Sequence, residues 1–96
     1  MNASPDLATW HSLMELDRAA GKVKGSAFRA FRHIESQWRE SLDFRVLDHE
    51  QDRATITALR DNGRIYASTV NLVLLSPAMA QAILDQMRRM TTDPAE

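Results

Sequence analysis

The chain has 96 residues, a formal net charge of −1 and no cysteine. Its length suits one small domain, and 44% apolar with 26% charged residues is an ordinary globular composition. Without cysteine there is no disulfide framework, cysteine zinc site or thiolate nucleophile. The near-neutral charge gives no overall attraction to nucleic acid or anionic lipid. We therefore expect a single domain over residues 1–96, with residues 1–5 and 91–96 frayed.

Neither a targeting signal nor a membrane span is expected. Residues Met1–Asp6 contain no basic region followed by an apolar stretch, which a signal peptide would require. The longest strongly apolar run, Val70–Leu75, is far shorter than the about 20 residues that cross a bilayer. The simplest expectation is a cytoplasmic protein without a membrane partner.

Two helices are expected in the first half. The first should cover residues 5–20, because Ser4-Pro5-Asp6 is a typical helix start and Gly21 a typical stop. The second should begin near Ser26 and run for about four turns. It carries an apolar stripe at helical spacing, made of Phe28, Phe31, Ile34, Trp38 and Leu42.

The middle of the chain has two interpretations. Phe44–Leu47 indicates a short strand, and the β-branched centre of residues 53–60 favours another. Asn62-Gly63 would then be a hairpin turn leading into a long strand over residues 65–75. In the alternative, residues 49–61 are helical, Asp48 is the cap, and Asn62-Gly63 ends the helix. We prefer the strands because the central Thr-Ile-Thr disfavours a helix.

A last helix should open at Ser76-Pro77 and carry a second apolar stripe, made of Met79, Ile83, Met87 and Met90. The expected fold class is therefore α+β. It consists of two N-terminal helices, a small antiparallel β-meander and a C-terminal helix, unless residues 49–61 are helical.

No motif points to catalysis, and we expect no enzymatic activity. A phosphate loop at Gly21-Lys22 fails, because position 16 is Leu and Val23 follows the lysine. The three histidines lie in separate segments without metal-ligand spacing: His11, His33 and His49. We therefore predict no catalytic residue, no cofactor and no metal.

Charge is unevenly distributed along the chain. Residues 18–32 contain five basic residues and no acid, whereas residues 35–52 contain six acids and two arginines. The basic block is most simply a solvated helix face. It is also a candidate contact for nucleic acid or for an acidic protein, through Lys22, Lys24, Arg29 and Arg32.

One further pattern consists of short segments spread over about residues 26–85. The segments are 28–31, 34–35, Trp38, 43–47, 58–60, 63–66, 70–71 and 73–75. Together they resemble a group of short uncharacterised proteobacterial proteins, some of which carry the label "ABC transporter ATPase". The resemblance implies no activity, and the missing phosphate loop gives the ATPase label no support.

We expect a small non-enzymatic bacterial accessory or regulatory protein. It would act by binding another protein or by self-association, for example as a homodimer. The Met stripe could be core, but Met-rich faces also form interfaces. The interface hypothesis names Met79, Ile83, Met87, Met90 and Trp10. The alternatives are a nucleic-acid-binding regulator using the basic block 18–33 and a phage-type inhibitor.

Overall fold

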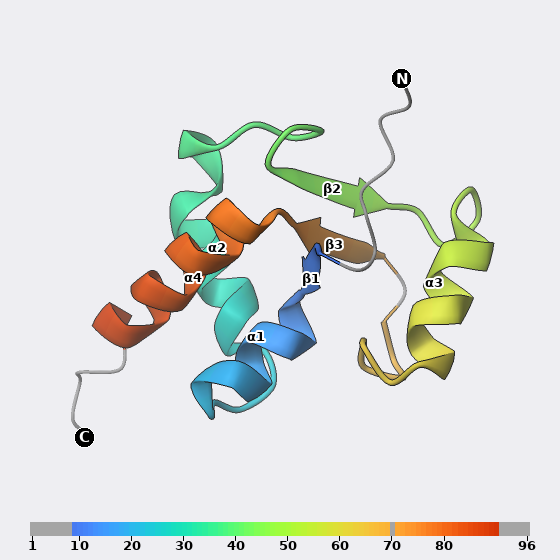
Figure 1. Cartoon of the computed structure of the whole chain (residues 1–96), viewed down its shortest axis with the longest axis horizontal. Helices are drawn as coiled ribbons and strands as arrows, with labels where there is room; N and C mark the ends of the chain where they lie inside the picture. Colours follow the sequence, from blue (N-terminus) through green and yellow to red (C-terminus); the bar gives the residue numbers. More distant parts are fainter. Residues whose placement is uncertain (1–8, 70, 91–96) are drawn as a thin grey trace.

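The computed structural model describes residues 9–69 and 71–90. It confirms the α+β class, with four α-helices and a three-stranded antiparallel sheet in this part of the chain (Figure 1). The expected frayed ends and the Ser4-Pro5-Asp6 helix start lie outside the described residues. In chain order the elements are β1 (His11–Ser12), α1 (Leu13–Ala20), α2 (Ser26–Ile34), the 3-10 turn η1 (Glu35–Gln37), β2 (Phe44–Leu47), α3 (Arg53–Asp61), β3 (Leu72–Leu75) and α4 (Pro77–Met90).

The sheet has the strand order β1-β3-β2, and both pairs are antiparallel. Its centre is β3, so β1 and β2 flank this strand instead of following one another as in a meander. Phe44 pairs with Leu75, and the register continues to Leu47 opposite Leu72. The apolar run of β3 is explained by its position, because a central strand covered on both faces has no polar side.

Helices cover both faces of this sheet. One face contributes Leu47, Leu72 and Leu74 to a core cluster with Ile56 and Leu59 of α3. The other face contributes Phe44 and Leu75 to a larger cluster with α1, α2 and α4. Figure 1 accordingly shows α3 on one side of the sheet and the other three helices on the opposite side.

The preferred strand over residues 53–60 was wrong, and the helical alternative holds from Arg53 to Asp61. Its start and its cap were wrong, because residues 49–52 form a turn closed by Asp48 and the N-cap of α3 is Asp52. Ile56 and Leu59 are three residues apart, so one helix face buries both against the sheet. The Asp48 carboxylate accepts hydrogen bonds from the backbone N–H of Glu50 at 2.9 Å and of Gln51 at 3.0 Å. Burial of two large side chains, about 1.5–3 kcal/mol each, outweighs a β-propensity difference of about 1 kcal/mol at most.

The prediction of a hairpin turn at Asn62-Gly63 was also wrong, because these residues end α3 and do not join two strands. Gly63 has a φ of 73° and its N–H donates to the carbonyl of Arg60 at 3.0 Å, which is a helix ending. The long strand expected over residues 65–75 is confined to Leu72–Leu75, and residues 64–69 form a loop.

The first helix begins later than expected. Residues 9–12 are not helical, and α1 starts at Leu13, where Ser12 and Glu15 form a capping box. The Ser12 hydroxyl accepts from the N–H of Glu15 at 3.1 Å, and the Glu15 carboxylate accepts from the N–H of Ser12 at 2.9 Å. The helix ends before Gly21, as predicted, and Trp10 precedes it.

The second helix is shorter than its apolar stripe suggested. It ends at Ile34, with η1 following, so only Phe31 and Ile34 of the stripe are fully buried. Phe28 remains 44% exposed and Leu42, in the loop before β2, is 63% exposed. The helical spacing therefore predicted burial for two side chains, Phe28 and Leu42, that are exposed in the structure.

The last helix agrees with prediction from Pro77 to Met90. Its start is capped by Ser76, whose hydroxyl accepts from the N–H of Met79 at 3.2 Å. Met79, Ile83 and Met87 are fully buried against the other helices. Across the described segments, every helix is too short or too polar to pass through a bilayer.

Candidate functional site

The helices cover one sheet face incompletely. Side chains alternate along a strand, so Val46 and Val73, which pair with each other, share the face of Phe44 and Leu75. Phe44 and Leu75 are buried under the helices, whereas Val46 is 49% exposed. Together with Phe28 in the first turn of α2, these two valines form an apolar surface. We call Phe28, Val46 and Val73 the open face.

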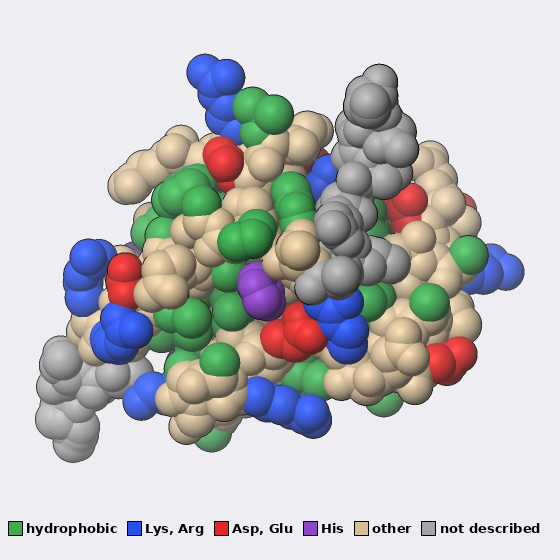
Figure 2. Space-filling model, viewed as in Figure 1, with side chains coloured by type: hydrophobic (Ala, Val, Ile, Leu, Met, Phe, Trp, Pro, Cys, Tyr) green, Lys and Arg blue, Asp and Glu red, His purple; other side chains and the backbone are tan. Residues whose placement is uncertain are grey.

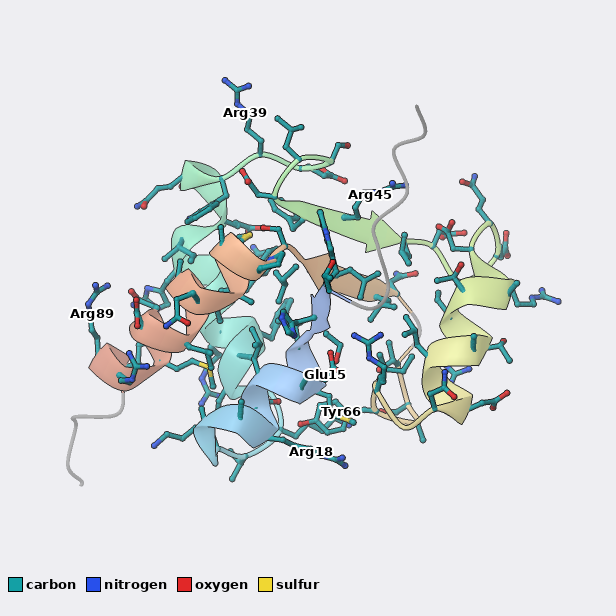
Figure 3. All side chains as sticks on the ribbon, in the orientation of Figure 1. Glu15, Arg18, Arg39, Arg45, Tyr66 and Arg89 are labelled. Atoms are coloured by element: carbon teal, nitrogen blue, oxygen red, sulfur yellow. The ribbon has the colours of Figure 1, made fainter. Side chains whose placement is uncertain are left out.

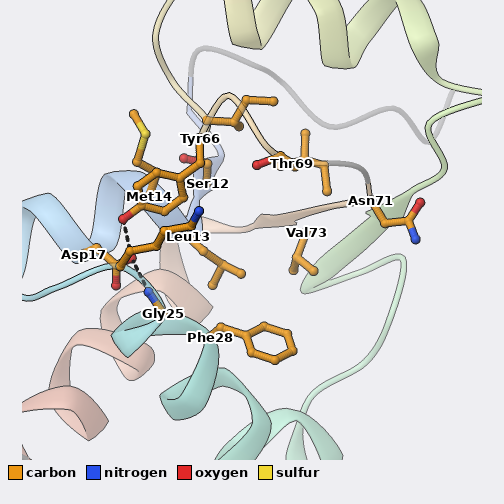
Figure 4. Close-up of a pocket in the computed structure, with 13 residues that line it drawn as sticks. Ser12, Leu13, Met14, Asp17, Gly25, Phe28, Tyr66, Thr69, Asn71 and Val73 are labelled. Atoms are coloured by element: carbon orange, nitrogen blue, oxygen red, sulfur yellow. Dashed lines mark hydrogen bonds between the residues drawn. The ribbon is translucent and has the colours of Figure 1, made fainter.

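A cavity of about 270 Å³ adjoins this open face. We call it the α1–α2 pocket, because α1, the start of α2 and residues from 65–69 and 71–73 line it. In Figure 4 Phe28 lies on one side of it and Thr69 and Asn71 on the other, with Val73 between them. Its apolar lining comes from Leu13, Met14, Phe28, Ile65, Leu72 and Val73.

The wall formed by α1 and α2 is held together by the buried carboxylate of Asp17. This side chain is only 1% exposed. It accepts a hydrogen bond from the backbone N–H of Gly25 at 3.1 Å (Figure 4). It also accepts one from the backbone N–H of Ala27 at 2.6 Å. Gly25 is the N-cap of α2 and has no side chain of its own. Asp17 therefore caps α2 from the neighbouring helix, where the helix dipole favours a negative charge.

Asp17 also fixes the loop opposite. The Tyr66 hydroxyl donates a hydrogen bond to it at 2.7 Å. Burial and this contact with a carboxylate both favour the protonated phenol, and they raise the pKa of Tyr66 to about 12. Lys24 covers the ring, with Nζ at 4.9 Å from its centroid, and donates to the Ser68 hydroxyl at 2.9 Å. Tyr66 is thus a structural donor here.

A second brace joins this loop to α1. Arg64 donates to the Glu15 carboxylate from Nε at 2.7 Å and from Nη2 at 3.0 Å, which makes a bidentate pair. Burial raises the pKa of Glu15, but hydrogen bonds from Arg64 and from the Ser12 N–H outweigh it, so this pKa is lowered overall. Arg64 Nη2 also donates to the Trp10 carbonyl at 2.6 Å. These hydrogen bonds from Arg64 hold α1 and the loop that follows α3 in fixed positions relative to each other.

The pocket is lined mainly by apolar side chains. Its titratable groups are Asp17, Lys24 and Tyr66, and each is engaged in the contacts above. The histidines lie apart in sequence, in β1, in α2 and ahead of α3. In residues 9–69 and 71–90 no three metal-ligating side chains converge. The pocket offers an apolar floor with polar groups at its edge.

The residues of the interface hypothesis lie elsewhere. Met79, Ile83 and Met87 are inside the core, so this conformation does not offer them to a partner. Met90 and Trp10 are partly buried and pack against the two core clusters. The Met stripe serves the core because α4 packs its apolar side on α1 and α2.

The basic residues singled out from the sequence are all exposed: Lys22, Lys24, Arg29 and Arg32. The structure brings only Lys24 to the pocket. Arg32 is paired with Glu35 at 3.2 Å. Both signs of charge are interspersed on the face seen in Figure 2, with apolar side chains reaching the surface between them.

Sequence reasoning missed the roles of Asp17, Phe28 and Val46. A signal was available for Asp17, because it follows Leu13 by four residues and so occupies a buried position of α1. An acid in an apolar stripe needs donors to satisfy it. Nothing local marked Phe28 and Val46 as exposed, since that depends on how far α2 extends over the sheet.

Comparisons with family models, curated proteins and solved structures found no match to this chain. The α1–α2 pocket and the open face beside it form the candidate functional site.

Proposed function

We propose that this chain is a protein-binding accessory module, and that a large apolar side chain of a partner protein inserts into the α1–α2 pocket. The observation that carries this proposal is a braced apolar pocket continuous with the exposed side chains of Phe28 and Val46. Exposed apolar surface that adjoins a preformed hollow is typical of binding sites.

The size of the pocket favours one inserted side chain over a cofactor. Its volume of about 270 Å³ lies below the usual range of roughly 300–1,000 Å³ for small-molecule sites. A single Leu, Phe or Trp side chain is small enough to enter this space. Protein interfaces concentrate their binding energy in such anchors, which enter fully desolvated pockets.

The surroundings favour an acidic partner segment. Lys24 lies at the pocket, and Lys22 and Arg29 are exposed on the adjoining loop and helix. The nearest acid, Asp17, is buried and satisfied by three donors. Thr69 and Asn71 add polar groups at the edge. An apolar centre with a polar and basic rim matches the usual anatomy of a protein interface.

The F28D variant tests the proposal. Panning a phage-displayed peptide library on the wild-type chain should enrich peptides with a large apolar residue beside acidic ones. Their affinity for F28D should fall about 10- to 200-fold, since about 1.5–3 kcal/mol of apolar burial is lost. Isothermal titration calorimetry measures the change.

L42D is the matched control, because Leu42 is also a large, exposed apolar residue but lies outside the pocket. It should bind the peptides as the wild type does. Equal peptide binding by F28D and the wild type would contradict the proposal. If R29E/R32E abolishes binding of a mixed oligonucleotide pool at low salt, and no peptide is enriched, nucleic acid is the ligand instead.

A further inference from the structure

A second exposed apolar side chain is held outward by a strained turn. We call residues 39–43 the Leu42 turn. Ser41 has a φ of 82°, a conformation that a non-glycine residue adopts at a cost of roughly 1–3 kcal/mol. The turn is fixed by backbone N–H donation from Ser41 to Phe44 at 2.6 Å and from Asp43 to Arg39 at 2.8 Å. The Asp43 carboxylate accepts from the Arg39 N–H at 2.9 Å.

This turn places Leu42 at the surface, where it is 63% exposed. Its flanking residues include the acids Glu40 and Asp43, and Arg39 projects away from the protein (Figure 3). For the isolated chain, a strained Ser41 beside an apolar Leu42 exposed to water is unfavourable on both counts. Such strain tends to be kept at sites of contact.

We propose that the occupant of the α1–α2 pocket is Leu42 of a second copy of this chain. This inference rests on the proposed function and names its partner. Leu42 is an apolar anchor of suitable size, and its acidic neighbours Glu40 and Asp43 complement Lys24 at the pocket. The anchor and the pocket are therefore both apolar, and the charges beside them are of opposite sign.

The contact is between molecules. Lys24 and Phe28 precede or begin α2, whereas the Leu42 turn follows η1 at the other end of that helix (Figure 1). In this structure Leu42 is exposed and does not line the pocket. Each copy therefore has one anchor and one pocket, which gives either a reciprocal pair or an open chain of copies.

Two variants separate the halves of this contact. L42D keeps the pocket and loses the anchor, whereas F28D keeps the anchor and loses the pocket. Sedimentation velocity should show concentration-dependent self-association of the wild type and its loss in each variant alone. V23S is the matched control. Val23 is 73% exposed but belongs to neither half, so V23S should associate like the wild type.

Mixing the two variants is the decisive step. The Val73 methyl signals of isotopically labelled L42D should shift when unlabelled F28D is added. They should not shift when an unlabelled L42D/F28D double variant is added. Urea unfolding of each variant confirms that it is folded.

A wild type that stays monomeric at millimolar concentration, or L42D that associates like the wild type, overturns the inference. Val73 signals that do not respond to F28D overturn it as well. If self-association fails in one of these ways while the wild type binds the selected acidic peptides and F28D does not, the proposed function stands and its partner is another protein.

Discussion

Replacing Asp17 with alanine is expected to lower the free energy of unfolding by about 3 kcal/mol or more. The substitution leaves three donors without their acceptor, namely the N–H of Gly25, the N–H of Ala27 and the Tyr66 hydroxyl. Each unsatisfied buried donor costs about 1–3 kcal/mol. Because small domains have only about 5–15 kcal/mol of stability, D17A should unfold at a much lower urea concentration.

Two further variants calibrate this effect. Y66F removes one of the three donors and should cost about 1.5–3 kcal/mol, as expected for a hydrogen bond to a charged group. D61N changes an exposed carboxyl and should stay within about 0.5 kcal/mol of the wild type. If D17A is no less stable than D61N, Asp17 does not cap α2 and brace the loop as described.

Replacing Ile83 with alanine is expected to lower the free energy of unfolding by about 2–5 kcal/mol, the range for deleting a buried aliphatic side chain. Ile83 is fully buried where α4 packs on the other helices. The variant tests whether the Met stripe belongs to the core or to an interface. Urea denaturation gives the stability, and sedimentation at a concentration where the variant remains folded gives the association state.

M90A is the control, since Met90 is only partly buried on the same stripe. It should cost clearly less than I83A. The core interpretation fails if I83A unfolds like the wild type but no longer self-associates, because that combination belongs to an interface residue.

The sequence predicted the elements whose signals agree with one another. For α4, the Ser76-Pro77 start and the stripe from Met79 both indicated a helix. Residues 53–61 gave conflicting signals, because Thr55 and Thr57 favour a strand while Ile56, Leu59 and the Asp48 cap favour a helix. Packing on the sheet decided between them, and no local pattern reveals where the sheet will lie.

The candidate site was harder to predict because its residues are far apart in the chain. The pocket is assembled from α1, the start of α2 and residues from 65–69 and 71–73. Its apolar residues have the same local patterns as core residues. Phe28 is the clearest case: it shares a stripe with Phe31, yet it lies over the half of the sheet that the helices leave open.

The central claim is that the α1–α2 pocket receives an apolar side chain of another polypeptide. The most direct measurement is an intermolecular nuclear Overhauser experiment on the wild-type chain with the tightest peptide from the library. We predict contacts from the peptide's apolar side chain to the Val73 methyls and the Phe28 ring. A bound peptide that shows its contacts at Lys22, Arg29 and Arg32 and none at Val73 would contradict this account.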